Sequence, residues 1–268
     1  MDYPKPYETI LLDVANHIAT VTINRPEAMN SFTKRMMDEC AHLWRAVAED
    51  DDIHVVVLRA APGRAFSTGV DVKAAQEEGG AVIHHNVFTA ADPGEKLGPK
   101  MNQCWKPVIA AVHGLCAGGA FYWISECDIV IASEDAAFFD PHVSYGMTAA
   151  LEPIGLTYRM PLGDVLRMAL LGNDERISAY TALRLGLVSE VTKPEDLWAR
   201  AQSLAETVAS KPPIATQGTV KAIWESLDMP RTTALRTALK YCQIGNPIGT
   251  AQVDRWALMG KQKKYETR

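Results

Sequence analysis

The sequence predicts an α/β fold whose last third is helical. Up to about residue 143, short runs of apolar and β-branched residues alternate with helical patterns, and beyond that point only helical patterns follow. With 268 residues, the chain can bury a substantial core as one domain. We therefore expect an α/β core over residues 1–192 and a helical C-terminal region over residues 193–268.

The first predicted elements are two strands, Thr9–Val14 and Ile18–Ile23, which the short segment between them joins into a hairpin. Ser31 or Thr33 can cap the helix that follows. This helix is predicted to end near Glu49, because apolar residues recur along it at helical spacing and give it one apolar face.

The next predicted strand, 54–60, leads into a turn of small residues with the sequence RAFSTGVDVK, residues 64–73. Between 76 and 99 the periodicity is weak, and Gly, Ala and acidic residues are frequent. Such a stretch is typical of a loop that covers a site. Residues 101–105 are predicted to end a short helix that leads into the central part of the chain.

The central stretch is Lys106–His142. It is predicted to contain a buried strand over 107–112, a turn with Gly114 and the pair Gly118–Gly119, a short helix over 120–127, and strands over 128–132 and 137–139. Glycine lets a backbone approach a ligand closely, and the first N–H groups of a helix have no partner within it. The turn after the 54–60 strand repeats this arrangement. Two such turns can donate N–H groups to one oxygen, as in an oxyanion hole, although a tight turn without a ligand also explains the glycines.

Beyond Val143 the sequence predicts helices only, and Pro212–Pro213 interrupts them. The predicted helices cover 155–160, 164–171, 178–186, 194–210, 215–227, 230–245 and 250–264.

Composition and charge argue against several classes of partner. The formal net charge of −5 disfavours a nucleic-acid surface, and no apolar run approaches the roughly 18 residues of a membrane span. The N-terminus lacks a signal-peptide pattern and the five cysteines show no CxxC spacing, so we expect a cytoplasmic protein with reduced cysteines. His84 and His85 have no Cys or His ligands nearby, so no metal site is expected.

Four segments together resemble the crotonase (enoyl-CoA hydratase/isomerase) superfamily. They are AFSTGVDVK, KPVIAAVHGLCAGGA, NRPEAMNSF (24–32) and LGNDERISAYTALRLGLVSEV (171–191), and the likeness extends over residues 20–191. The resemblance implies a crotonase-like (ββα)n spiral core, an acyl-CoA substrate, and no cofactor other than the coenzyme A of that substrate. It also implies that the helical C-terminal region packs against neighbouring subunits in a homotrimer or a dimer of trimers.

The resemblance also assigns residue roles. The backbone N–H groups of Val70 and Gly119 form the oxyanion hole for a thioester enolate. Hydratases of the superfamily use two glutamates, and the matching positions here are Tyr122 and His142. A tyrosine, with an ordinary pKa of about 10, is no ready base at neutral pH, whereas a histidine, with an ordinary pKa of about 6.5, can be base or acid. Tyr122 can donate a hydrogen bond or simply pack as an aromatic residue.

Three carboxylates are candidates to orient His142. Asp140 shares a face with it if the segment is extended, and Glu126 lies one helical turn beyond Tyr122, although a surface or subunit contact is the favoured interpretation of Glu126. Glu152 resembles an acidic catalytic residue in other branches of the superfamily, among them the β-diketone hydrolases, which also have a histidine after a proline. A helix cap or surface role is the alternative for Glu152. The catalytic candidates are therefore His142, Tyr122 and Glu152.

The resemblance places the adenine and pantetheine of CoA at the loops 25–29 and 65–69. The implied substrate- and CoA-binding residues are Arg25, Ala28, Met29, Ala65, Ser67, Thr68, Gly69, Gly118 and Lys261. The candidate cations for the phosphates are Arg25 and the tail lysines Lys261, Lys263 and Lys264, although a solvated helix end explains the tail lysines as well.

We therefore predict an enoyl-CoA hydratase/isomerase-family enzyme, a lyase or isomerase, that uses a histidine in place of the two glutamates. Hydration, isomerisation and hydrolysis of a C–C bond in a β-diketone or β-keto ring are all compatible with these residues, as is thioester hydrolysis. A catalytically silent acyl-CoA-binding protein is the alternative from another class, because Tyr122 removes one acid–base group.

Overall fold

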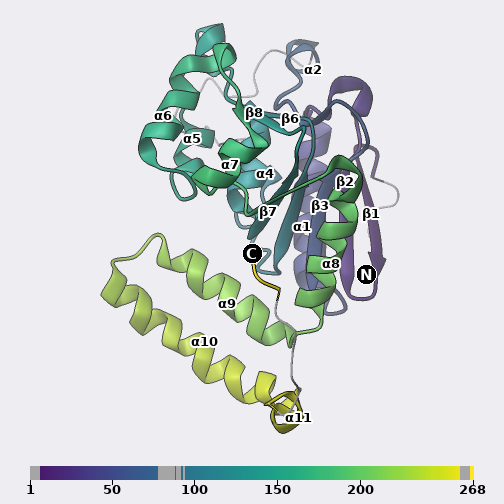
Figure 1. The fold of residues 1–268 in the computed structure, drawn as a ribbon, viewed down its shortest axis with the longest axis vertical. Coiled ribbons are helices and arrows are strands. Elements are labelled where there is room, and N and C mark those ends of the chain that lie inside the picture. The colour runs from purple at the N-terminus through teal and green to yellow at the C-terminus, as the bar shows by residue number, and fades with distance from the viewer. Residues whose placement is uncertain (1–6, 78–87, 89–91, 93, 260–265) are drawn as a thin grey trace.

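The strands in the described part of the chain form two sheets (Figure 1). The structure is a computed structural model that describes residues 7–77, 88, 92, 94–259 and 266–268. The larger sheet has the strand order β1-β2-β3-β5-β7-β10, and the smaller has the order β4-β6-β8-β9. The β1–β2 and β8–β9 pairs are antiparallel and the other neighbouring pairs are parallel.

Each element is a short stretch of the chain. The larger sheet consists of β1 (Ile10–Ala15), β2 (Ile18–Ile23), β3 (Val55–Ala60), β5 (Val108–Val112), β7 (Ile129–Ser133) and β10 (Glu190–Thr192). The smaller sheet consists of β4 (Ala65–Ser67), β6 (Leu115–Ala117), β8 (Ala137–Phe139) and β9 (Ile177–Ser178). The α-helices of the first two thirds are α1 (Lys34–Glu49), α2 (Val72–Glu77), α3 (Gly94–Leu97), α4 (Phe121–Glu126), α5 (Leu151–Leu156), α6 (Leu162–Leu171) and α7 (Ala179–Leu185). Those of the C-terminal third are α8 (Leu197–Ala209), α9 (Pro213–Ser226), α10 (Arg231–Ala251) and α11 (Arg255–Met259).

Three successive stretches of chain each form one strand of the larger sheet and then one strand of the smaller sheet. The stretches are β3–β4, β5–β6 and β7–β8, and α2 and α4 follow the first two. This repeat is the (ββα)n spiral, so the predicted α/β crotonase-like core with helical C-terminal elements is confirmed. Because β4 and β6 are paired, the turns that follow them are neighbours in space.

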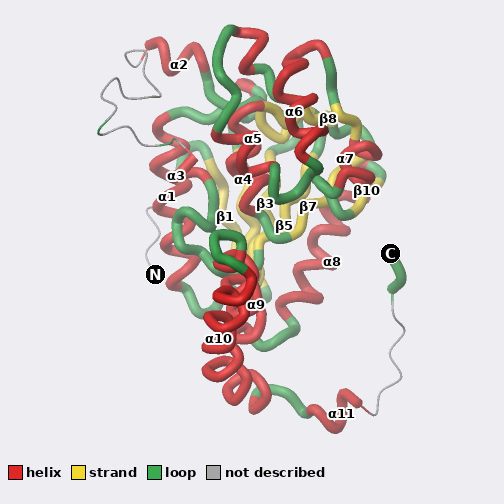
Figure 2. Tube along the Cα trace, turned by 90° about the vertical axis from the view of Figure 1, so that its left-hand side faces the viewer, coloured by secondary structure: helices red, strands yellow, loops and turns green. Residues whose placement is uncertain are grey.

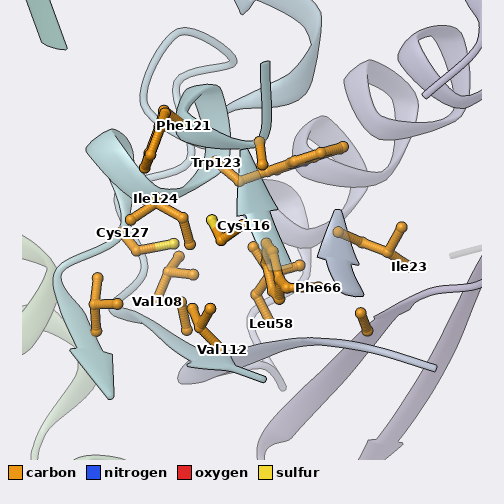
Figure 3. Packing of buried hydrophobic residues seen from close by; sticks show 14 of the residues in the cluster. Ile23, Leu58, Phe66, Val108, Val112, Cys116, Phe121, Trp123, Ile124 and Cys127 are labelled. Carbon is orange, nitrogen blue, oxygen red and sulfur yellow. The ribbon is translucent and has the colours of Figure 1, made fainter. Parts of the chain in front are cut away.

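The inner strands of the larger sheet, β2, β3, β5 and β7, are buried on both faces, between α1 on one side and α8 on the other (Figure 2). Along β3, Val56 and Leu58 belong to the cluster on the side of α1 and α4, whereas Val55 and Val57 belong to the cluster on the side of α8. Figure 3 shows the first cluster, where side chains of α4 such as Trp123 pack over the strands. A parallel strand covered on both faces is a continuous apolar run, which is why the sequence identified β3.

Two predictions near the N-terminus are confirmed. The hairpin joins β1 and β2, with Ile10 opposite Ile23. Of the two candidate caps of α1, Thr33 is the one used, because its hydroxyl accepts a hydrogen bond from Met36 N at 3.3 Å.

The predicted helix at 101–105 is wrong. Residues 101–103 form a turn, and the short helix before it is α3. A side chain takes the place of helical hydrogen bonds here. The Asn102 amide donates to the backbone carbonyls of Glu95 and Gly98 at 3.0 and 2.8 Å. The predicted 155–160 helix lies earlier in the chain, as α5, where Pro153 occupies the first turn that proline favours.

The boundary predicted at 245–250 is also wrong, because α10 continues through Pro247. Helix α10 packs against α9 in a hairpin that extends away from the two sheets (Figure 1). Close packing of Gly245 and Gly249 of α10 on Ile214 of α9 supports the helix across the proline. Of the helix predicted over 250–264, the structure contains α11, and residues 260–265 lie outside the described residues. No described helix has both the length and the apolar composition that crossing a membrane requires.

Trp44 generates a testable prediction about stability. Its ring is fully buried, and its Nε1 donates to Leu97 O of α3 at 2.7 Å. Trp44→Phe keeps most of the packing but leaves a buried carbonyl without its donor, so we expect the free energy of unfolding to fall by about 1–3 kcal/mol in urea denaturation. Trp256→Phe is the control, because Trp256 is 82% exposed and should not change stability. Equal stability of the two variants would show that the bond to α3 contributes nothing.

Candidate active site

The first feature of the site is the contact between two glycine turns, one after β4 and one after β6. Gly69 has a φ of +84°, and a Cβ built on it would lie 2.8 Å from Gly119 N and 3.1 Å from Ala117 O. A Cβ built on Gly119 would lie 2.5 Å from the ring of Phe32. A side chain at Gly69 would therefore force the turns apart, and one at Gly119 would displace the Phe32 ring. The structure brings these two predicted site residues together through their backbones alone.

Val70 is held next to this contact by a short backbone bridge to Phe32. Phe32 N donates to Gly69 O at 2.8 Å, and Asp71 N donates to Phe32 O at 2.9 Å. These two bonds fix the peptide groups on both sides of Val70 without using the Val70 N–H. Gly119 lies at the start of the helical turn that leads into α4, where N–H groups have no helical partner.

His142 lies beside the same turns, in the short 3-10 helix that follows β8. A Cβ on Gly118 would be 3.7 Å from Cε1 of His142 and 3.4 Å from Cδ of Pro141. Asp140 is fully buried, and its Oδ1 accepts the backbone N–H of His142 at 3.0 Å and contacts the imidazole Nδ1 at 2.5 Å. A carboxylate accepts hydrogen bonds, so Nδ1 is the protonated donor to Asp140 and Nε2 is the nitrogen that faces Glu152. The pairing arises from a turn, not from the extended segment that the sequence suggested.

Glu152 of α5 and Tyr122 of α4 complete the cluster. Glu152 is buried, and its Oε1 lies 3.7 Å from Nε2 of His142. Tyr122 interacts through its hydroxyl with Glu152 and with Asp92. Its ring packs on the backbone of Gly94, where a Cβ would lie 2.1 Å from the ring. The three predicted catalytic side chains therefore gather in one cluster next to the glycine turns.

The surroundings shift the pKa values of all three side chains upward. The hydrogen bond to Asp140 raises the pKa of His142 and outweighs the opposing effect of burial. Burial raises the pKa of Glu152, and the charges of Asp140 and Asp92 act in the same direction. Burial and the neighbouring carboxylates of Glu152 and Asp92 raise the pKa of Tyr122. Its hydroxyl is therefore a hydrogen-bond donor and not a base.

Asp92 and Gly94 are site neighbours that the sequence did not indicate. Both lie in the stretch where periodicity is weak, and neither belongs to a motif that places it near Tyr122. Glu126, which the sequence interpreted as a surface or subunit contact, points into the protein instead. Its Oε2 accepts hydrogen bonds from Lys100 N and Met101 N at 2.6 and 3.1 Å.

The expected CoA-binding loops are also adjacent to one another. Asn30 joins them, because its side chain accepts a bond from Arg25 N and donates to Ala65 O, each at 2.8 Å. The guanidinium of Arg25 donates to Ser31 O at 2.6 Å and pairs with Asp71 at 2.9 Å. Arg25 therefore fastens the 25–31 turn to Asp71, which follows Val70.

The other predicted binding residues divide between the interior and the surface. Ala65, Ser67 and Gly118 are buried, whereas Met29 is 38% exposed, and Ala28 and Thr68 are half-buried. The Ser67 hydroxyl accepts a bond from Gly69 N at 3.2 Å and is used within its own turn.

Some predictions fall outside the described residues. Lys261, His84 and His85 lie there, so the structure says nothing of their placement. Among the described residues, no group of His, Cys, Asp and Glu side chains has the arrangement of a metal site.

Comparison with known proteins agrees with this architecture. The family model described as "Enoyl-CoA hydratase/isomerase" matches residues 13–261. The (E)-benzylidenesuccinyl-CoA hydratase of Thauera aromatica is 38% identical over 82% of this chain and 84% of its own length. The mitochondrial Delta(3,5)-Delta(2,4)-dienoyl-CoA isomerase of Mus musculus is 32% identical over 79% of this chain and 67% of its own. An enoyl-CoA hydratase/isomerase structure from Mycobacterium paratuberculosis superposes with a TM-score of 0.81 at 36% identity, covering 95% of this chain and 94% of that one.

The chain belongs to the enoyl-CoA hydratase/isomerase family of the crotonase superfamily. It is therefore an enzyme of hydratase or isomerase type, the class that acts on CoA thioesters.

The contact between the glycine turns generates the second prediction. Gly69→Ala places a methyl group against Gly119 N and requires a left-handed backbone that alanine disfavours, so the two turns must separate. We expect turnover of an acyl-CoA substrate to fall about 100-fold or more, measured spectrophotometrically at the α,β-double bond. Gly163→Ala is the control, because nothing lies within 4 Å of its built Cβ. Full activity of Gly69→Ala would show that turn contact is not needed for catalysis.

Proposed function

We propose that this enzyme hydrates an enoyl-CoA, with the backbones of Val70 and Gly119 binding the enolate oxygen and His142 with Glu152 transferring protons. One observation supports this proposal above the others. The reactive Nε2 of His142 faces Glu152 at 3.7 Å while Asp140 holds Nδ1 at 2.5 Å, beside the glycine turns. A titratable pair next to two backbone donors is what enolate chemistry at a thioester requires.

The proposed oxyanion hole depends on donors that are fixed before the substrate binds. In a CoA thioester, attack at Cβ moves charge onto the thioester oxygen, and two preorganised N–H groups stabilise it. Loss of one such donor typically costs about 3–4 kcal/mol of transition-state stabilisation. The close approach of Gly69 to Gly119 N supports the assignment, because it makes the two turns immediate neighbours, as donation to one oxygen requires.

In the proposed step, the pair of His142 and Glu152 holds one proton. The member without the proton takes one from water, the water oxygen bonds to Cβ, and the other member gives its proton to Cα. The pair ends with one proton, so the protons balance. The separation of 3.7 Å is too long for a direct hydrogen bond, which leaves both atoms able to bond a water molecule. Since the two groups are coupled, the proton belongs to the pair and not to one residue.

Asp140 and Tyr122 are proposed to orient the pair. Asp140 holds the imidazole through Nδ1, so that Nε2 points to Glu152. Tyr122 interacts with the Glu152 carboxyl group from α4 and, as a donor, limits its rotation. In this arrangement the carboxylate that hydratases of the superfamily have on α4 is replaced in space by one from α5.

The first experiment is mass spectrometry of enoyl-CoA and cyclic β-keto acyl-CoA substrates incubated with wild type and His142→Ala. We expect wild type to add one water to an enoyl-CoA with the thioester intact, and the variant to be slower by about 100-fold or more. His17→Ala is the control, since His17 is exposed in the β1–β2 turn.

Other outcomes would contradict the proposal. Water gain only from a β-keto ring would indicate a C–C bond hydrolase, and release of free CoA would indicate thioester hydrolysis. Tight acyl-CoA binding without any product would indicate a silent binding protein.

The second experiment is the pH dependence of kcat/KM in Asp140→Asn. In wild type, Asp140 raises the pKa of His142, so the pair keeps its single proton to a higher pH. Asparagine still accepts the Nδ1–H bond but has no charge, so the pair loses its proton at a lower pH. The high-pH limb of the profile should therefore shift to lower pH. Asp13→Asn, at an exposed position of β1, should leave the profile unchanged, and an unshifted limb in Asp140→Asn would exclude this role of Asp140.

A further inference from the structure

Glu126 connects α4 to the segment Gly94–Met101 through its carboxylate. Its Oε2 accepts two consecutive backbone N–H groups, from Lys100 at 2.6 Å and from Met101 at 3.1 Å. The backbone approaches so closely that a Cβ on Gly98 would lie 2.2 Å from the same oxygen. The carboxylate thus fastens the C-terminal end of this segment to the last turn of α4.

The N-terminal end of the same segment contacts Tyr122. The Tyr122 ring occupies the space that a Cβ on Gly94 would need, and Asp92, just before it, interacts with the Tyr122 hydroxyl. Asp92 also caps the start of α3, because its Oδ1 accepts Gly94 N at 2.9 Å. Tyr122 and Glu126 are four residues apart, so they share a face of α4, and one segment spans both.

We propose that Glu126 is a positioning residue of the active site, which holds the Gly94–Met101 segment on α4 so that Gly94 and Asp92 fix Tyr122 against Glu152. The inference rests on the proposed function, in which Tyr122 orients Glu152. Glu126 does not reach the reacting atoms, and its effect on catalysis passes through the segment and Tyr122.

Ionisation of Glu126 lowers stability relative to its protonated form, although the side chain holds two backbone N–H groups, so folding alone does not explain a carboxyl group at this position. Burial raises the pKa of Glu126 from 4.5 to about 7, with Asp92 acting in the same direction and Lys100 against it. Because the folded protein disfavours the charge more than the unfolded chain does, this group reduces the free energy of unfolding as pH rises from 4.5 to about 7. Strongly shifted groups of this kind concentrate at functional sites.

The test compares kcat and KM for three variants. Glu126→Ala should lower kcat about tenfold or more, with a smaller change in KM, because Tyr122 is displaced from a catalytic carboxyl group. Glu126→Gln should keep kcat near the wild-type value, because the amide oxygen of glutamine can accept the same two N–H groups. The matched control is Glu39→Ala. Glu39 accepts two consecutive N–H groups as well, from Glu8 and Thr9 at 2.9 Å each, but it does so at the start of β1.

Both alanine variants should lose stability, and only Glu126→Ala should lose kcat. An unchanged kcat in Glu126→Ala, with His142→Ala inactive, would overturn this inference and leave the proposed function in place. An active His142→Ala would overturn the proposed function and this role of Glu126 with it. If Glu126→Ala fails to fold, Glu126→Asp gives the same comparison, because the shorter side chain keeps the charge but cannot reach both N–H groups.

Discussion

The candidate site depends on a contact that involves no side chain, the approach of the Gly69 turn to Gly119 N. Two neighbouring features of the fold hold these backbone segments within van der Waals distance. The pairing of β4 with β6 makes the turns neighbours, and the bridge from Phe32 fixes the peptide groups beside Val70. A site built from backbone groups tolerates wide changes in side chains, provided that glycine is retained at the two points of contact.

Much of this architecture could be predicted from the sequence, because the relevant signals are local. The runs of apolar residues identified β1, β2, β3, β5 and β7, and the last four of these are buried on both faces. The expectation of helices only beyond Val143 was wrong, because the short strands β9 and β10 lie there, and two or three residues give no periodic pattern. The hairpin, α1 with its Thr33 cap, and the glycine turns also follow from short-range patterns. The errors occurred where side chains or tertiary packing override local preference, as at Asn102 and at Pro247.

The arrangement around His142 could be predicted only in part. Asp140 is two residues away, so its pairing depends on a local turn, although the sequence suggested an extended segment. The distance between His142 and Glu152 depends on how α5 is placed relative to the 3-10 helix that bears His142, and no local pattern encodes that. The same is true of Asp92, which reaches Tyr122 from a part of the chain without clear periodicity. Side chains that meet through packing of distant elements leave no trace in residue spacing.

The burial of the inner strands of the larger sheet on both faces also affects how the enzyme loses activity and unfolds on heating. Hydrogen bonds between β3 and β5 lie between two apolar layers, so they open only when one layer separates from the sheet. The turns that bear Gly69 and Gly119 follow directly from the β3–β4 and β5–β6 stretches. Backbone geometry at the site is thereby tied to strands that are shielded from water on both faces. Inactivation and global unfolding should then be one cooperative event, without a folded but loosened form in between.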